Sequence, residues 1–159
     1  MTSHTDVKIQ KCDIESPAAV ELLSALNAEL DLRYPEDGGN FFELDSSDVM
    51  SGHGAFLAAY IGDTPVGCGA VRRLDDDDFE IKRMYVSPSF RGRRIGTTIL
   101  TALQSEAEIL GASRLVLEAG DRQPEALALY RRSGFSEIPR FGQYVDAPLS
   151  VCMAKNLGT

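Results

Sequence analysis

The segment from Met84 to Gly96 constrains the fold more than any other part of the chain. Its sequence, MYVSPSFRGRRIG, reads as the end of a strand, a loop rich in glycine and arginine, and the first turn of a long helix. The first N–H groups of a helix lack intrahelical partners and carry partial positive charge, so they bind an anion placed there. The glycines let a bulky ligand approach the backbone, and the arginines add positive charge around the same point. The segment therefore predicts a phosphate-binding loop between a strand and a helix.

The charge balance of the whole chain makes this basic loop a local feature. The formal net charge is −8 over 159 residues. Nucleic acids and anionic membranes need a broad basic face, so we expect neither as a partner. An amine or another cationic substrate is compatible with this charge.

The size and the cysteine pattern indicate one domain without a metal. The chain of 159 residues, 43% of them hydrophobic, is sufficient for one core, and we expect a single domain over residues 1–159. Cys12, Cys68 and Cys152 show no C-x-x-C spacing, which argues against both a disulfide framework and a zinc site. No signal peptide or membrane-spanning run is visible, so we expect a cytoplasmic location.

The hydrophobic period alternates between two and about 3.6 residues, which predicts an α/β or α+β fold. Ser16 and Pro17 are an N-cap and a first helical residue, and the helix that they open is expected to end near Tyr34. Phe79 to Val86 alternates apolar and polar side chains as a strand with two faces does. We expect further strands at 7–12, 55–61, 65–74, 114–119, 135–138 and 150–154, and further helices at about 45–51, 95–110 and 123–133.

Two motifs carry a family resemblance. The pattern V-x-P-x-x-R-G-x-x-I-G from Val86 resembles the acetyl-CoA pyrophosphate loop of the GNAT superfamily of acyl-CoA N-acyltransferases. The usual family pattern is Q/R-x-x-G-x-G/A, so Arg91 and Gly96 match, whereas Arg94 stands where the middle glycine is expected. A residue there needs to be glycine only if its φ is positive, and we interpret Arg94 as a mild departure. Residues 123–135 resemble the family's A-x-x-L-Y-x-x-x-G-F segment.

The resemblance implies both a fold and a co-substrate. The implied fold is one GNAT-like domain with a central mixed, mostly antiparallel, splayed sheet of about six to seven strands flanked by about four helices. Residues 140–151 are similar to a bacterial small-molecule branch of the superfamily. Acetyl-CoA is the implied co-substrate, without a metal, and a homodimer through the C-terminal strands is expected. The implied CoA-binding residues are Met84, Tyr85, Val86, Arg91, Gly92, Arg93, Arg94, Ile95, Gly96, Thr97, Pro124 and Ala126.

Transfer of an acetyl group to an amine requires a base and an acid. An alkylamine is neutral only about once in 2500 molecules at pH 7, a cost of roughly 4.6 kcal/mol, so a group must take its proton. Glu80 is our candidate base, because its spacing from the loop resembles that of a glutamate in the histone-acetylating branch; the alternative is a surface pair with Lys82 or Arg83. By resemblance, Tyr130 lies beside the CoA sulfur and protonates the leaving thiolate; the alternative is a tyrosine at the core edge.

The acceptor is the least determined part of the prediction. The substrate-binding candidates are Arg33, Tyr34 and Tyr144, with Asp31 and Glu43 beside them. Arg33 and Tyr34 could bind a carboxylate while nearby acids hold an amine, which indicates an amino-acid-like acceptor. We therefore predict an N-acetyltransferase that acts on a primary amine of a small molecule by direct attack in a ternary complex. The alternatives are a protein or peptide N-terminal acetyltransferase and a non-catalytic acyl-CoA sensing module.

Overall fold

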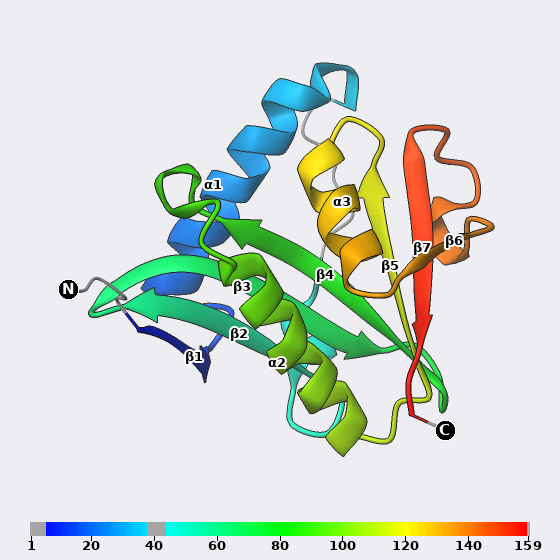
Figure 1. Ribbon diagram of the computed structural model, residues 1–159, viewed down its shortest axis with the longest axis horizontal. Coiled ribbons are helices and arrows are strands. Elements are labelled where there is room, and N and C mark those ends of the chain that lie inside the picture. Colours follow the sequence, from blue (N-terminus) through cyan, green and yellow to red (C-terminus); the bar gives the residue numbers. More distant parts are fainter. Residues whose placement is uncertain (1–5, 38–43, 159) are drawn as a thin grey trace.

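A seven-stranded sheet with the order β1-β2-β3-β4-β5-β7-β6 forms the centre of the molecule (Figure 1). The computed structural model describes residues 6–37 and 44–158. Only β4 and β5 are parallel neighbours, and the other five neighbouring pairs are antiparallel. The strands are β1 (Val7–Lys11), β2 (Gly54–Ile61), β3 (Thr64–Arg73), β4 (Asp78–Val86), β5 (Arg114–Gly120), β6 (Ser136–Ile138) and β7 (Ser150–Asn156). The predicted mixed, mostly antiparallel sheet is confirmed.

Three α-helices, where about four were expected, are present in the described parts of the chain. They are α1 (Pro17–Arg33), α2 (Ile95–Ile109) and α3 (Pro124–Arg132). The helix expected near 45–51 is a short 3-10 turn, Ser46–Val49, and three other 3-10 turns connect longer elements. At the start of α1 the Ser16 hydroxyl accepts a hydrogen bond from the Ala19 N–H at 3.3 Å, as its N-cap pattern predicts. None of the described helices is long and apolar enough to cross a membrane.

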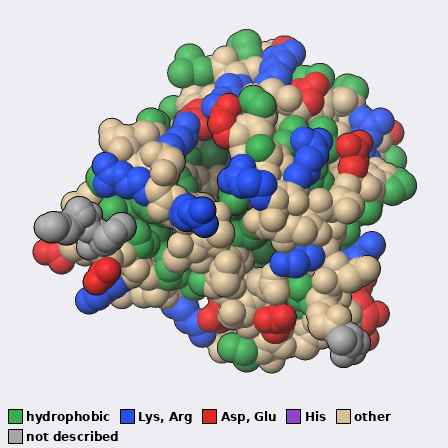
Figure 2. Space-filling view, viewed as in Figure 1, with side chains coloured by type: hydrophobic (Ala, Val, Ile, Leu, Met, Phe, Trp, Pro, Cys, Tyr) green, Lys and Arg blue, Asp and Glu red, His purple; other side chains and the backbone are tan. Residues whose placement is uncertain are grey.

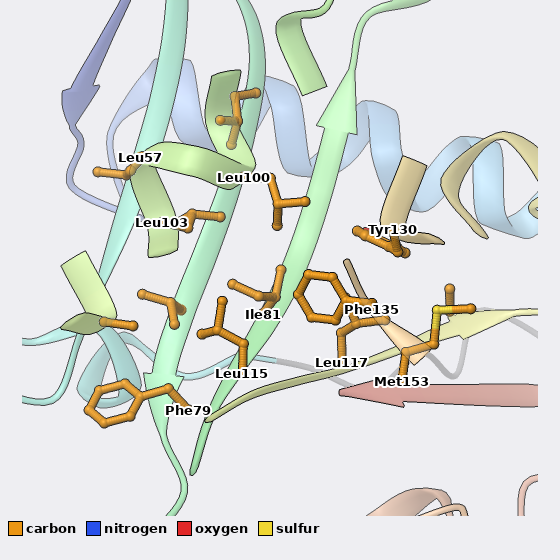
Figure 3. Packing of buried hydrophobic residues seen from close by; sticks show 14 of the residues in the cluster. Leu57, Phe79, Ile81, Leu100, Leu103, Leu115, Leu117, Tyr130, Phe135 and Met153 are labelled. Atoms are coloured by element: carbon orange, nitrogen blue, oxygen red, sulfur yellow. The ribbon is translucent and has the colours of Figure 1, made fainter. Parts of the chain in front are cut away.

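The helices cover opposite faces of the sheet. Leu22 and Leu26 of α1 pack against one face, where they contact a cluster that includes Phe56 and Tyr85. The other face is covered by α2 and α3, and their apolar side chains share a larger cluster with Ile81, Leu115, Leu117 and Met153 (Figure 3). In that cluster Tyr130 packs edge-to-face on Phe135, with ring centroids 5.9 Å apart. Burial of apolar surface on both faces fixes the positions of β4 and β5, on which the site depends.

The two parallel strands separate after a short paired stretch. Pairing of β4 with β5 ends at Ile81 and Leu117, and Figure 1 shows the two strands diverging from one corner of the sheet with α3 over the gap. The splayed sheet that the resemblance implied is therefore present. Beyond Ile81, the edge of β4 that faces β5 has no strand partner among the residues that the structure describes.

A bulge in β4 interrupts the alternation that was predicted for 79–86. Gly69 of β3 is opposite two residues of β4, Arg83 and Met84, and Arg83 has a φ of 58°. A Cβ at position 69 would lie 2.7 Å from the Met84 sulfur, so this close approach requires glycine. The extra residue shifts the phase of the strand, and Met84 and Val86 share the face with Ile81. The bulge thus aims Met84 and Val86 at the α2 and α3 side of the gap.

Candidate functional site

A cavity of about 420 Å³ lies where β4 ends and α2 begins. It is lined by the end of β4, by the loop that follows, by the first turn of α2 and by one side of α3. Figure 2 shows Lys and Arg side chains gathered over this side of the molecule. Ten of the twelve predicted CoA-binding residues line the cavity: Met84, Tyr85, Val86, Arg91, Gly92, Arg94, Ile95, Gly96, Thr97 and Ala126.

The remaining two predicted residues, Arg93 and Pro124, do not line the cavity. The guanidinium of Arg93 lies 5.2 Å from the centre of the Phe90 ring, and Pro124 is the first residue of α3. The prediction missed Glu29, Glu125 and Leu129, which line the cavity from α1 and α3. Glu29 is distant in sequence from both motifs, whereas Glu125 and Leu129 lie within the second motif, which did not show that their side chains line the cavity.

The cavity fits the pyrophosphate and the pantetheine arm of CoA. The first N–H groups of α2 have no intrahelical acceptor, and the residues of this turn, Ile95, Gly96 and Thr97, line the cavity, so an anion could be bound there. The unpaired edge of β4 offers backbone groups to an extended chain, as an exposed sheet edge does to a peptide. Arg91 donates from Nε to the Val86 carbonyl at 2.8 Å and from its terminal nitrogen to Glu29 at 2.6 Å. Its side chain is thereby fixed at the rim of the cavity.

Arg94 departs from the family pattern more strongly than the sequence indicated. It is the N-cap of α2 and has a φ of 63° and a ψ of 20°, in the left-handed region. The expectation that this position does not require glycine depended on a φ that is not positive, and that expectation is corrected. An L-residue other than glycine is strained there by roughly 1–2 kcal/mol.

We expect Arg94→Gly to raise the free energy of unfolding by about 0.5–1 kcal/mol, because glycine removes the strain at this backbone conformation. Arg93→Gly is the matched control: Arg93 is not among the positive-φ residues of the described chain, so its replacement should lower stability. Urea unfolding of both variants measures the difference. Equal destabilisation by Arg94→Gly and Arg93→Gly would contradict the strain that we assign to the backbone of Arg94.

A second cavity, of about 450 Å³, lies in the gap between β4 and β5. Its wall combines apolar residues of α1 with charged and hydroxyl groups from the strands and from the segment before β7. Four residues line both cavities: Met84, Gln123, Ala126 and Tyr130. The two cavities are therefore neighbours that share one wall, and Tyr130 of α3 is part of that wall.

Tyr130 is the best-placed candidate acid. Its side chain is 5% exposed, and its hydroxyl makes no hydrogen bond to another residue in the part of the chain that the structure describes. Burial, with the nearby Glu118 carboxylate as a smaller cause, raises the pKa of this phenol above its ordinary value of about 10. Tyr130 is thus a protonated donor at neutral pH whose hydroxyl is not engaged by the protein. Its packing on Phe135 also fits the structural alternative, so its catalytic role stays a prediction.

Glu80 lies in a buried network behind the second cavity. It is 0% exposed and does not line either cavity. Arg72 donates from Nε to one carboxylate oxygen at 2.9 Å, and the Tyr144 hydroxyl donates to the other at 2.6 Å. The surface pair with Lys82 or Arg83 that was the alternative is wrong: Lys82 is itself buried, and Arg83 donates to Asn27 of α1. A catalytic role for Glu80 stays a prediction, and it would have to act through Tyr144.

Two charged residues that the sequence analysis did not select face the second cavity. Lys82 of β4 and Glu118 of β5 line it from the two sides of the gap. Ile81 and Leu117 are the last residues that pair between β4 and β5, and both belong to the cluster under α2 and α3. Because side chains alternate along a strand, Lys82 and Glu118 point to the opposite face. The Lys82 ammonium donates to the Tyr144 hydroxyl at 3.1 Å, and Glu118 accepts from the Ser150 hydroxyl at 2.6 Å. The sequence signal that could have identified Glu118 is a charged residue directly after an apolar run, as in Leu115–Glu118.

The predicted substrate-binding residues divide between the two cavities. Tyr34 and Tyr144 line the second cavity, and the Tyr34 hydroxyl accepts from the Arg122 backbone N–H at 2.7 Å. Arg33 lines the first cavity instead, where it pairs with Glu125 at 3.0 Å. Asp31 is exposed and lines neither cavity, and Glu43 lies outside the described residues. Because Arg33 and Tyr34 line different cavities, this arrangement does not favour a carboxylate site made by the two residues together.

No cysteine is placed to act as a covalent nucleophile in either cavity. None of the three cysteines lines either cavity, and all three are free thiols. Burial raises the pKa of the Cys68 thiol to about 12, which keeps it in its unreactive protonated form. Groups of three or more metal-ligating side chains are also absent from residues 6–37 and 44–158. The arrangement instead suits a reaction between two ligands held side by side.

Comparison with known proteins agrees with this geometry. A model of the acetyltransferase (GNAT) family matches residues 19–135. A protein named IAA acetyltransferase from Azospirillum brasilense is 37% identical over 150 residues, which cover 90% of this chain and 95% of that protein. The crystal structure of a proposed acyl-CoA N-acyltransferase from Klebsiella pneumoniae has a TM-score of 0.83 and 31% identity, and the match covers 98% of this chain and 100% of that one. A GNAT family acetyltransferase from Elizabethkingia anophelis with acetyl-CoA bound shares the fold, with a TM-score of 0.68, 19% identity and coverage of 95% and 98%.

Proposed function

The chain belongs to the GNAT family of acetyltransferases and is an acetyl-CoA-dependent acyltransferase, and we propose that it acetylates the primary amine of a small-molecule or amino-acid-like acceptor by direct attack in a ternary complex. The observation that carries the proposal is the wall that the two cavities share at Tyr130. Acetyl-CoA supplies a thioester whose acetyl group can be passed across this wall. The first cavity holds CoA, and the second holds the acceptor.

Tyr130 of the shared wall and Glu118 of the second cavity supply the two proton transfers that the reaction needs in our proposal. The amine nitrogen forms a C–N bond with the acetyl carbon, the C–S bond breaks, and one proton leaves the nitrogen while one reaches the sulfur. In our proposal Glu118 accepts the proton from the amine, because its carboxylate lines the acceptor cavity. Tyr130 donates to the leaving sulfur, since its protonated hydroxyl lies in the wall between the cavities. Glu80 orients Tyr144 from behind the cavity.

Direct attack is supported by the same geometry. An acetyl-enzyme route through a cysteine is not favoured, because none of the three cysteines lines either cavity. Initial rates with both substrates varied should therefore give intersecting double-reciprocal lines. Parallel lines, or an acetylated protein found by mass spectrometry after incubation with acetyl-CoA alone, would contradict direct attack.

Calorimetric titration with acetyl-CoA, followed by a free-thiol release assay in the same sample, tests the proposed function. The acceptor panel contains amines, amino acids, peptides and IAA, the compound in the name of the Azospirillum relative. We expect binding, and thiol release that depends on a small amine or amino acid. Binding without release by any acceptor would favour the sensing module, and release with peptides alone would favour an N-terminal acetyltransferase. No binding would contradict the CoA site itself.

A further inference from the structure

Lys82 carries a buried positive charge that forms no ion pair with any residue that the structure describes. Lys82 is 7% exposed, and it lines the acceptor cavity. Among the described residues its one hydrogen bond goes to the neutral Tyr144 hydroxyl, at 3.1 Å, and no carboxylate lies within ion-pair distance. An ammonium has three N–H donors, so two of them have no acceptor within residues 6–37 and 44–158. A buried ion in this state is costly unless a ligand pairs with it.

The neighbouring carboxylate does not serve as this partner. Both oxygens of Glu80 accept from other donors, Arg72 and Tyr144. Arg72 has a second acidic partner, Asp48, at 3.4 Å. Arg72, Glu80 and Asp48 together carry one positive and two negative charges. Neither carboxylate forms an ion pair with the Lys82 ammonium, which contacts the hydroxyl and the ring of Tyr144 instead. Burial lowers the pKa of Lys82 from its ordinary value, and the Glu80 charge opposes that effect.

We propose that Lys82 binds a carboxylate of the acceptor, so that the substrate class is a zwitterion with a free amine and a carboxylate a few atoms apart. This inference rests on the proposed function. Lys82 and Glu118 follow the last register pair of β4 and β5, Ile81 and Leu117, where neighbouring strands are about 4.8 Å apart. The two charged side chains consequently face one cavity from positions on adjacent strands. An α-amino acid presents its ammonium and carboxylate at a similarly short separation.

A carboxylate fits this cavity better than a more highly charged anion. Glu36 and Glu118 also line it, and the whole chain carries a net charge of −8, so a dianion would meet repulsion that a zwitterion avoids. A single ammonium pairs with a single negative charge. The carboxylates of Glu36 and Glu118 then remain for the amine that is to be acetylated.

The test compares acceptors that differ only in this group. Each amino acid that gives thiol release is assayed beside its carboxamide, which keeps the amine and removes the negative charge. We expect the wild type to prefer the carboxylate form by at least tenfold in kcat/KM. Lys82→Met should reduce that preference at least tenfold, chiefly through KM of the carboxylate acceptor, and Lys82→Arg should restore part of it. Lys8→Met, at an exposed position on β1, is the matched control and should keep the wild-type preference.

The outcomes separate this inference from the proposed function. Thiol release with equal efficiency for carboxylate and carboxamide would overturn the inference and leave the acetyltransferase proposal in place. An equal loss for both acceptors in Lys82→Met, with the preference unchanged, would assign Lys82 a structural role only. The wild-type comparison needs no variant, so it decides the question even if Lys82→Met does not fold. Absence of release with every acceptor would contradict the proposed function, and the inference with it.

Discussion

Tyr130→Phe should lower kcat by about 10²-fold or more while the KM for acetyl-CoA stays within about threefold of the wild-type value. The change removes only the hydroxyl, and no hydrogen bond of that hydroxyl within the described chain is lost. The ring and its edge-to-face contact with Phe135 at 5.9 Å are kept, so CoA binding and folding should be nearly unaffected. Loss confined to kcat is the signature of a group that acts in the chemical step.

The pH dependence adds a second check on Tyr130. Burial raises the pKa of its phenol above about 10, so the wild-type hydroxyl stays protonated throughout the neutral and mildly alkaline range. We therefore expect no alkaline loss of kcat from this group below about pH 10. If kcat of the wild type fell below about pH 10 and kcat of Tyr130→Phe did not, the phenol would ionise at a lower pH than this prediction requires.

Tyr60→Phe is the control for this prediction. Tyr60 of β2 is the one tyrosine of the chain that lines neither cavity, so removal of its hydroxyl should leave kcat and both KM values unchanged. Full turnover by Tyr130→Phe at saturating concentrations of both substrates would show that the tyrosine has the structural role instead.

The sequence predicted the parts of the site that lie within continuous motifs. The strand, loop and helix around residues 84–96 are local, because glycines and hydrophobic spacing indicate them, and ten of the predicted CoA residues line one cavity. Tyr130 was proposed in the same way, from a continuous helical segment, and it lines both cavities. The expected homodimer, by contrast, depends on contacts between chains and stays a prediction.

The acceptor side could not be predicted in the same way, because it depends on where two strands separate. Pairing of β4 with β5 stops after Ile81, and the bulge at Arg83 then changes the direction of the next residues. Neither feature has a clear local signal. Lys82 and Glu118 therefore looked like ordinary strand residues, whereas Glu80 received a role through its spacing from the loop. The left-handed φ of Arg94 was missed for a related reason, since an arginine gives no indication of it.

Glu80→Ala should lower the free energy of unfolding by about 3–5 kcal/mol, because it removes the one fully buried carboxylate of a charged network and leaves its partners. Arg72 would keep only the longer contact with Asp48, at 3.4 Å, and the Tyr144 hydroxyl would lose its acceptor at 2.6 Å. In a domain of 159 residues the expected fall in Tm is roughly 10–15 °C. Thermal and urea unfolding of the purified variant measure it.

Two further variants show whether this loss comes from burial of unpaired charge. Asp48→Ala removes the more exposed partner of Arg72 and should cost at most about 1 kcal/mol. The double variant Arg72→Met/Glu80→Leu removes both charges of the closest pair, and it should be more stable than Glu80→Ala because no arginine is left without its partner. Equal costs for Glu80→Ala and Asp48→Ala would contradict this account. They would also weaken the assignment of Glu80 as the group that holds Tyr144 at the acceptor cavity, since a contact that adds so little to stability would not fix a side chain.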